Sequence, residues 1–430
     1  MKRVITTVFP SKGVIPYPGV FPGKMAGNDQ RLPNNAYRLY STMQIKEIRV
    51  RHANRSIWGH LAEREKTLPL VTPLDIYTDF KEARGSWFWD SGLAAIQIET
   101  DDGIVGTGWC EDGCDAVRPI VENHLSRLLI DQDPLDIESL WDRLFRATLP
   151  YGRKGAVLQV ISAIDIALWD LKGIAAGKPV YELLGGPVTD SVPVYASALH
   201  PVGHDKVRDE ARAYVTEGYG AMKMRFPYGP GDGEKGMEEN EAHIANAREA
   251  VGPDIDLMAD AYMGWNLSYA VEMCGRLEPY GLAWVEEPLI PDDLDGYASL
   301  RKETPIPISG GEHEYTLFGF RDIIQKGAMD IIQPDLRRCG GFTEGQRIAA
   351  LAAESGTTLI PHAYGITHLH FALANKNIPM IEYFPLPCWD SLPDAEVEPI
   401  FHGEPQPENG KVEVEPRPGL GVEVNEKIFS

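Results

Sequence analysis

The stretch Ala283-Trp284-Val285-Glu286-Glu287-Pro288 is a short apolar run that ends in carboxylates. Such a run is typical of a buried strand, and an acid at its end lies where the strand gives way to a loop. Two similar runs flank it. Asp260 ends one of them 26 residues earlier, and Glu312 follows the other 26 residues later. The equal spacing places the three acids at equivalent positions.

Short apolar strands alternate with helical stretches on both sides of these runs. We expect strands at residues 192–198, 221–226, 255–262, 283–287, 306–310, 330–334, 358–361 and 380–383. Eight strands that alternate with helices predict a parallel α/β barrel. A doubly wound sheet is the competing architecture, but no GxGxxG motif follows any of these strands.

The rest of the chain divides into segments that differ in composition and in hydrophobic pattern. Residues 1–42 are rich in Pro, Gly and Asn and predict an irregular extension, a candidate for contact with a partner subunit of a homo-oligomer. Residues 43–185 predict an α+β domain, with a strand at 45–50, a hairpin of 93–99 and 105–109, and helices at 119–129, 137–147 and 156–175. The barrel takes residues 186–384. In the segment 385–430 we expect short strands at 412–414 and 422–424 and a return to the first domain.

Composition restricts the partners and the compartment. Asp and Glu number 63 against 41 Lys and Arg in 430 residues, a net charge of −22, which disfavours nucleic acid and membrane surfaces. The five cysteines form no CxxC pair and are typical of the reduced thiols of a cytoplasmic protein. The apolar run after Lys2 and Arg3 stops at Pro10, too short for a signal peptide, and no stretch approaches a membrane span.

The three acids Asp260, Glu286 and Glu312 predict a metal site. The carboxyl ends of barrel strands converge on one mouth, where buried carboxylates repel one another unless a cation lies among them. Ligation by oxygen alone suits Mg²⁺, one ion per subunit. The alternative is that each acid caps the helix after its strand. That explanation suits a single acid better than three in register.

Further strand ends carry groups suited to proton transfer and anion binding. Asp335 and His362 end the next two strands, and a carboxylate beside an imidazole fixes its tautomer and raises its basicity. A histidine after an apolar run is otherwise often a buried structural side chain. Lys223 and Arg225 alternate at the end of the second strand, so both face the mouth and offer an anionic substrate the positive charge that the chain lacks overall. They could also only balance the carboxylates.

These residues, in this order, resemble the mandelate racemase subgroup of the enolase superfamily. The resemblance also covers Glu382 and the ending Pro418-Gly419-Leu420-Gly421-Val422, and it extends from about residue 43 to 425. It implies a modified (β/α)7β barrel under an α+β capping domain, the metal ligands Asp260, Glu286 and Glu312, and a dyad of His362 with Asp335.

Within the subgroup the chain resembles the L-rhamnonate dehydratase family of acid-sugar dehydratases. The similar stretches include Ala167-Leu168-Trp169-Asp170-Leu171, Gly229-Pro230-Gly231-Asp232-Gly233 and Gly311-Glu312-His313. This likeness implies substrate contacts for Arg84 in the cap and for His313. The chain departs from the family at Glu314, where a second histidine is usual, and at Arg225, where proline is usual.

The function expected from the resemblance is dehydration of an aldonate of the L-rhamnonate or L-lyxonate type. The substrate carboxylate binds Mg²⁺ near Lys223, Arg225 and a protonated Glu382, and His362 takes the C2 proton. The enediolate then expels the C3 hydroxyl to leave a 2-keto-3-deoxy acid, with His362 or His313 as the general acid. One rival is a racemase, epimerase or cycloisomerase on the same scaffold. The other is a non-catalytic binding protein with a relic site.

Overall fold

The computed structural model describes residues 43–53, 69–77, 79, 92–111, 115–385 and 399–429. Residues 43–430 form one compact unit, distinct from residues 1–42. The predicted N-terminal extension, Arg84, Cys114 and Cys388 lie outside the described residues. Cys110, Cys274 and Cys339 are buried free thiols, as expected.

The first part of this unit is an antiparallel sheet covered by helices, as predicted. Its strands β1 (Ile45–Ala53), β2 (Leu93–Thr100) and β3 (Val105–Glu111) pair in that order. The amide of Thr100 donates to the carbonyl of Ile104 at 2.9 Å, which closes the β2–β3 hairpin at the predicted turn. The helical segments that follow are α2 (Val117–Ile120), η3 (Val121–Leu125), α3 (Ser126–Leu129), α4 (Ile137–Thr148), α5 (Ala156–Ala176) and α6 (Val180–Leu183).

The second part is the predicted barrel. Its eight parallel strands lie side by side in the order β10-β9-β8-β7-β6-β5-β4-β11, and residues 186–385 are described throughout. The chain order runs around the sheet without reversal, which excludes a doubly wound sheet. The strands are β4 (Ser191–Ser197), β5 (Ala221–Arg225), β6 (Asp256–Asp260), β7 (Trp284–Glu286), β8 (Ile308–Gly310), β9 (Ile331–Ile332), β10 (Thr358–Leu359) and β11 (Ile381–Tyr383).

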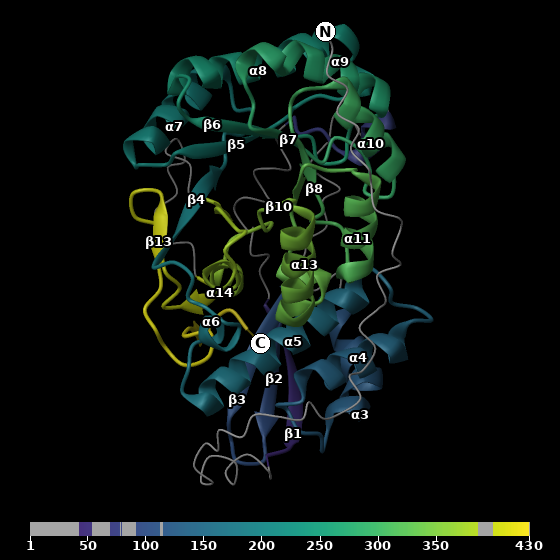
Figure 1. Ribbon diagram of the computed structural model, residues 1–430, viewed down its shortest axis with the longest axis vertical. Helices are drawn as coiled ribbons and strands as arrows, with labels where there is room; N and C mark the ends of the chain where they lie inside the picture. The colour runs from purple at the N-terminus through teal and green to yellow at the C-terminus, as the bar shows by residue number, and fades with distance from the viewer. Residues whose placement is uncertain are drawn as a thin grey trace, which may run out of the picture. The chain divides into compact units, whose positions relative to one another are not determined.

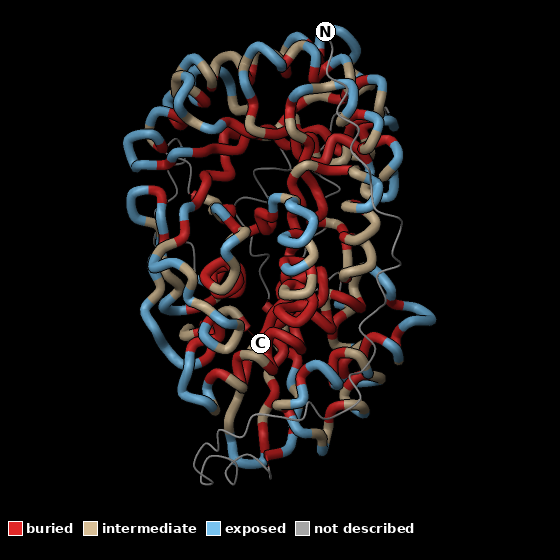
Figure 2. Tube along the Cα trace, viewed as in Figure 1, coloured by how far each residue is buried: buried red, intermediate tan, exposed pale blue. Residues whose placement is uncertain are grey.

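Helices follow the first seven barrel strands, which is the (β/α)7β pattern. They are α7 (His204–Thr216), α8 (Gly233–Val251), α9 (Leu267–Leu277), α10 (Leu294–Glu303), α11 (Thr316–Lys326), α12 (Leu336–Cys339) with α13 (Gly341–Ser355), and α14 (Ile366–Ala374), with the short 3-10 helices η4 (Pro230–Asp232) and η5 (Glu278–Tyr280). A further 3-10 helix, η1 (Pro73–Ile76), lies between β1 and β2 in the chain. Figure 1 shows helices α7 to α11 around the outside of the strands. In Figure 2 the strands are buried and exposed residues lie on the outer helix faces.

The barrel interior has an apolar floor below a polar mouth. The floor is a buried cluster of Tyr195, Ala221, Met258, Trp284, Ile331 and Ile360, one residue from each of six strands or strand ends. Two residues further along β5, β6 and β7 stand Lys223, Asp260 and Glu286, all buried. Because side chains alternate along a strand, the mouth residues face the same way as the floor residues. The polar groups therefore sit inside the barrel at its carboxyl end.

The C-terminal segment touches both parts. Strand β13 (Lys411–Glu413) pairs antiparallel with β4 of the barrel. Strands β12 (Phe401–His402) and β14 (Glu423–Val424) pair with each other, and Phe401 and Phe429 pack in one buried cluster with Trp109 of β3. The domain boundaries stay predictions. No helix in the described ranges is long and apolar enough to cross a membrane.

Glycines set the approach of β3 to α5. A Cβ atom added at Gly108 would lie 1.9 Å from the carbonyl oxygen of Ala163, and one at Gly106 would lie 2.2 Å from that of Ala167. Both obstacles are backbone atoms of a buried helix. Only glycine permits this packing without a shift of the helix.

We expect Gly108→Ala to lower the free energy of unfolding by at least about 2 kcal/mol, because the added methyl group forces α5 away from the sheet. Chemical denaturation measures the change. Gly275→Ala is the matched control. This exposed glycine in α9 has nothing within 4 Å of an added Cβ, so the same substitution should stabilise by about 0.5–1 kcal/mol. Equal effects of the two changes would contradict the packing argument.

Candidate active site at the barrel mouth

The register of the parallel strands aligns the charged strand ends. Arg225 pairs with Asp260, and Asp260 pairs with Glu286, across β5, β6 and β7. Residues paired in a parallel sheet point the same way, so these three side chains converge on the mouth. This convergence of Arg225, Asp260 and Glu286 follows from hydrogen bonding of the backbone. Glu312 lies beyond the end of β8, so its place beside Asp260 and Glu286 stays a prediction.

Lys223 lies between two carboxylates. Its Nζ forms ion pairs with Glu286 Oε1 and, at 2.8 Å, with Glu382 Oε1. Burial lowers the pKa of Lys223, but Glu286 and Glu382 together hold it well above its usual range. Burial has the opposite effect on Glu382 and raises its pKa, but Lys223 and His362 outweigh it and lower the pKa to about 2. The expectation of a protonated Glu382 is therefore wrong, because its partner is a buried cation.

The cationic partners of Asp260 and Glu286 offset the negative charges of these two carboxylates only in part. Arg225 Nη1 donates to Asp260 Oδ2 at 2.9 Å. Burial, followed by repulsion from Glu286, nevertheless raises the pKa of Asp260 to about 7. Glu286 accepts hydrogen bonds at Oε2 from Trp284 Nε1 at 2.9 Å and from Gln333 Nε2 at 2.8 Å. Burial raises its pKa as well, despite Lys223. The two carboxylates thus repel each other even with their cationic partners.

Glu312 lies between two histidines. His362 Nε2 is 3.4 Å from its Oε2, and His313 Nε2 is 3.7 Å from its Oε1. Burial raises the pKa of Glu312, but His362, His313 and Arg338 outweigh it and lower the pKa below its usual range. Each imidazole also has a carboxylate at its other nitrogen: His362 Nδ1 is 2.9 Å from Asp335 Oδ2, and His313 Nδ1 is 2.8 Å from Glu287 Oε2.

The contact predicted between Asp335 and His362 is thus present, and it belongs to a larger group. Asp335 also accepts from Arg337 Nη2 at 2.7 Å and from Arg337 Nε at 3.0 Å, and His368 Nε2 lies 3.2 Å from its Oδ1. Burial raises the pKa of Asp335, but Arg337 and the histidines hold it well below its usual value. Burial lowers the pKa of His362, but Glu312 and the bond to Asp335 raise it overall.

Glu287 is a site residue that the sequence reasoning missed. It follows Glu286 directly, so strand alternation would turn it out of the barrel. Its backbone has φ 39°, and this left-handed turn redirects the chain. Oxygen and nitrogen atoms of Glu287, Glu312 and His313 lie within 4.8 Å of one another, the one group of metal-ligand type found in the described part of the chain. The adjacent acid of the same Glu-Glu-Pro motif was the available signal.

The residues at the mouth fit a hard divalent cation. Asp260 and Glu286 are buried and repel each other, and both effects raise the pKa of Asp260. A cation among the carboxylates would offset the cost of burying their charges and would relieve the repulsion. Oxygen donors match the preference of Mg²⁺. The set Asp260, Glu286 and Glu312 stays a prediction, and Glu287 and His313 are further possible donors beside it.

Family models match most of the described chain. The model described as mandelate racemase / muconate lactonizing enzyme, N-terminal domain, matches residues 80–185, and the model described as enolase C-terminal domain-like matches residues 206–428. The L-rhamnonate dehydratase of Saccharopolyspora erythraea is 38% identical over 84% of this chain and 90% of its own length. The chain belongs to the mandelate racemase / muconate lactonizing enzyme family of the enolase superfamily.

Solved structures of similar proteins superimpose well on this chain. Rhamnonate dehydratase from Gibberella zeae complexed with Mg has a TM-score of 0.80 and 33% identity, over 90% of this chain and 95% of that one. The 3,6-anhydro-D-galactonate cycloisomerase from Zobellia galactanivorans has a TM-score of 0.72 and 30% identity, over 90% of this chain and 99% of that one. The enolase-like fold is therefore established, while the folds alone do not separate dehydratase from cycloisomerase.

The two departures from the L-rhamnonate dehydratase pattern have different environments. Glu314 is buried, and its Oε2 accepts from Lys154 Nζ of the α4–α5 loop at 2.8 Å. This residue joins the capping part to the barrel. Arg225 is half-buried and reaches Asp260, as described above. Arg84 lies outside the described residues, so its proposed substrate contact stays a prediction.

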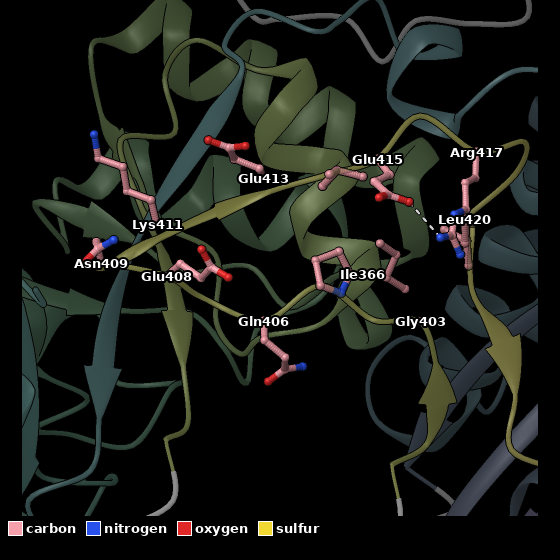
Figure 3. A pocket seen from close by; sticks show the side chains of 13 residues that line it. Ile366, Gly403, Gln406, Glu408, Asn409, Lys411, Glu413, Glu415, Arg417 and Leu420 are labelled. Atoms are coloured by element: carbon pink, nitrogen blue, oxygen red, sulfur yellow. Dashed lines mark hydrogen bonds and ion pairs between the residues drawn. The ribbon is translucent and has the colours of Figure 1, made fainter. Parts of the chain in front are cut away.

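A separate pocket of about 560 Å³ lies on the C-terminal segment. Figure 3 shows Glu415 and Arg417 at one end of it, joined by an ion pair of 2.7 Å, with Lys411 and Asn409 at the other. The lining residues include Ile366 and Leu420 but no side chain of the carboxylate and histidine groups described above.

We expect Asp335→Asn to lower the free energy of unfolding by about 3–5 kcal/mol, because it leaves the buried guanidinium of Arg337 without its carboxylate. Asp142→Asn on α4 is the control. Asp142 pairs with Arg146, whose side chain is 60% exposed, and its loss should cost about 1 kcal/mol or less. Urea denaturation of both variants compares them. A small effect at Asp335 would show that the Arg337 pair is not structurally important.

Proposed function

We propose that this chain is a Mg²⁺-dependent acid-sugar dehydratase that removes the C2 proton of an aldonate and eliminates the C3 hydroxyl. The observation that carries the proposal is His362, hydrogen-bonded to Asp335 at 2.9 Å and 3.4 Å from Glu312. Similarity to L-rhamnonate dehydratases supports the reaction. On this proposal the metal ligands are Asp260, Glu286 and Glu312.

Each protein group has a separate part in the proposed reaction. Lys223 and Arg225 lie near the substrate carboxylate, and His362 accepts the C2 proton while Asp335 fixes its tautomer. When bound, Mg²⁺ supplies positive charge that stabilises the enediolate as it forms. The protonated His362, or His313 held by Glu287, then donates to the departing hydroxyl.

A two-base racemase is less well supported than a dehydratase. Such an enzyme needs a second base opposite His362. Lys223 is held charged by Glu286 and Glu382, since its pKa is well above the usual value. Arg225 cannot lose a proton near neutrality. The cation face of the mouth therefore offers charge but no base, which favours proton abstraction from one side.

The substrate proposed is L-rhamnonate or the shorter L-lyxonate, as the resemblance implies. A screen of aldonic and aldaric acids with Mg²⁺, with detection of a 2-keto product, tests the reaction. Calorimetric titration of Mg²⁺ separates an enzyme from a relic binding protein. A chain that neither binds Mg²⁺ nor turns over any acid would favour the relic.

We expect His362→Asn to reduce kcat by at least about 1,000-fold, because His362 is the proposed base for the C2 proton. Mg²⁺ affinity should change by less than about threefold, since His362 is not among the proposed ligands. Initial rates and calorimetry measure the two effects. Glu286→Gln is the contrasting variant and should lose Mg²⁺ affinity as well as turnover. Near-normal turnover of His362→Asn would refute the proposed base.

Stereochemistry gives an independent expectation. Enzymes similar to this one take the proton from the 2R face with the histidine, so acids of 2R configuration should react and their 2S epimers should not. Product formation from paired epimers in deuterium oxide with Mg²⁺ measures the preference. Comparable rates for both epimers would mean that a second base, such as Lys223, operates.

A further inference from the structure

Glu111 ends strand β3 of the capping part and lies against the barrel. Its side chain is buried, with the residue 6% exposed. Oε1 accepts a hydrogen bond from Arg338 Nη2 at 3.0 Å. The other oxygen, Oε2, is buried and has no hydrogen-bond partner among the described residues. Burial raises the pKa of Glu111, but Arg338 and Arg337 outweigh it and lower the pKa, so the group is a carboxylate anion.

The guanidinium group of Arg338 lies between Glu111 and Glu312, one of the proposed metal ligands. Arg338 Nη1 donates to Glu312 Oε1 at 3.1 Å while Nη2 donates to Glu111. The neighbouring Arg337 binds Asp335 and lies over the Trp109 ring at 4.6 Å from its centroid. Two residues of β3, Trp109 and Glu111, thus contact the arginine pair that holds two carboxylates of the mouth.

An unpaired carboxylate oxygen in a buried position is costly. Nearly all buried polar atoms have a partner, and an exception calls for an explanation such as a ligand. The missing partner must be a hydrogen-bond donor, because a carboxylate only accepts. A hydroxyl group is a neutral donor, so it can satisfy Oε2 without disturbing the Arg338 pair.

The position in the barrel of Arg338, the partner of Glu111, indicates which hydroxyl this is. Lys223 and Arg225 belong to β5, and Arg338 follows β9. In a ring of eight strands, β5 and β9 are four steps apart, on opposite sides. On the proposed function, a substrate whose carboxylate lies by Lys223 and Arg225 and whose C2 faces His362 would have its other end free to extend toward β9. That end of a sugar acid carries hydroxyl groups.

We propose that Glu111 is a specificity-determining residue that accepts a hydrogen bond from a hydroxyl at the far end of the polyhydroxy acid. The proposal rests on the proposed function and adds to it a substrate contact from the capping part. The substrates recognised would be polyhydroxy acids that are long enough to reach from Lys223 and Arg225 of β5 to Glu111 of β3. Such acids carry a hydroxyl group at C4 or beyond.

Glu111→Gln tests the contact in the full-length protein. The glutamine keeps an acceptor for Arg338 but places an amide group in place of the free oxygen. For six- and five-carbon aldonates we expect kcat/KM to fall about 10- to 100-fold, as for a hydrogen bond to a charged group. For the three-carbon acid glycerate, which has no hydroxyl beyond C3, kcat/KM should change less than about twofold. Glu122→Gln, an exposed glutamate, is the matched control.

Binding separates this idea from the proposed function. Calorimetry with 3-deoxy aldonates, which lack the leaving group, should show a 10- to 100-fold weaker Kd for six-carbon but not for three-carbon analogues. Mg²⁺ affinity should stay within about twofold of wild type. If wild type turns over no acid, the proposed function fails, and the calorimetric series still decides whether Glu111 recognises chain length.

Two results would overturn the proposal. A loss of equal size for every chain length would mean that Glu111 acts only by positioning Arg338 and Glu312. No loss for any acid would mean that Oε2 contacts water or another part of the protein. Glu111→Asp is the second variant if Glu111→Gln folds poorly, and it should show the same dependence on chain length with a smaller effect.

Discussion

Repulsion among buried carboxylates is the constraint on which this structure depends. The parallel register of β5, β6 and β7 brings Asp260 beside Glu286 at the barrel mouth, and like charges in a medium of low dielectric constant interact strongly. Cations relieve the repulsion one by one: Arg225 at Asp260, Lys223 at Glu286 and Arg338 at Glu312. Because the relief at Asp260 is incomplete, the mouth favours a further cation.

The same constraint explains why the capping part and the barrel depend on each other. Arg337 and Arg338 neutralise Asp335 and Glu312, and both arginines are buried by contact with β3. Buried guanidinium groups need partners on every side. Trp109 and Glu111 supply them from the capping sheet. Loss of the β3 contact would leave the arginines, and with them two carboxylates of the mouth, without fixed positions.

The sequence predicted the parts that periodicity and spacing control. All eight barrel strands, the β2–β3 hairpin and the contact of His362 with Asp335 are present. It could not predict what depends on a single backbone angle or on packing between distant segments. Glu287 enters the site through a positive φ angle, and Glu111 meets Arg338 across 227 residues of chain. The protonation of Glu382 was mistaken because its ion pair with Lys223 was not foreseen.

The charge state of Lys223 and Arg225 on β5 bears more than the fold does on whether a two-base reaction is possible. A dehydratase and a cycloisomerase both superimpose on this chain with TM-scores above 0.7, so the scaffold permits either. On the proposed function the base is His362, and a two-base racemase would need a second base opposite it. Lys223 is held between Glu286 and Glu382 and stays charged. To act as a base it would have to lose its proton while facing two carboxylates, which would leave their repulsion unrelieved. On the proposed function, the groups that stabilise the mouth therefore also restrict its proton chemistry to the His362 side.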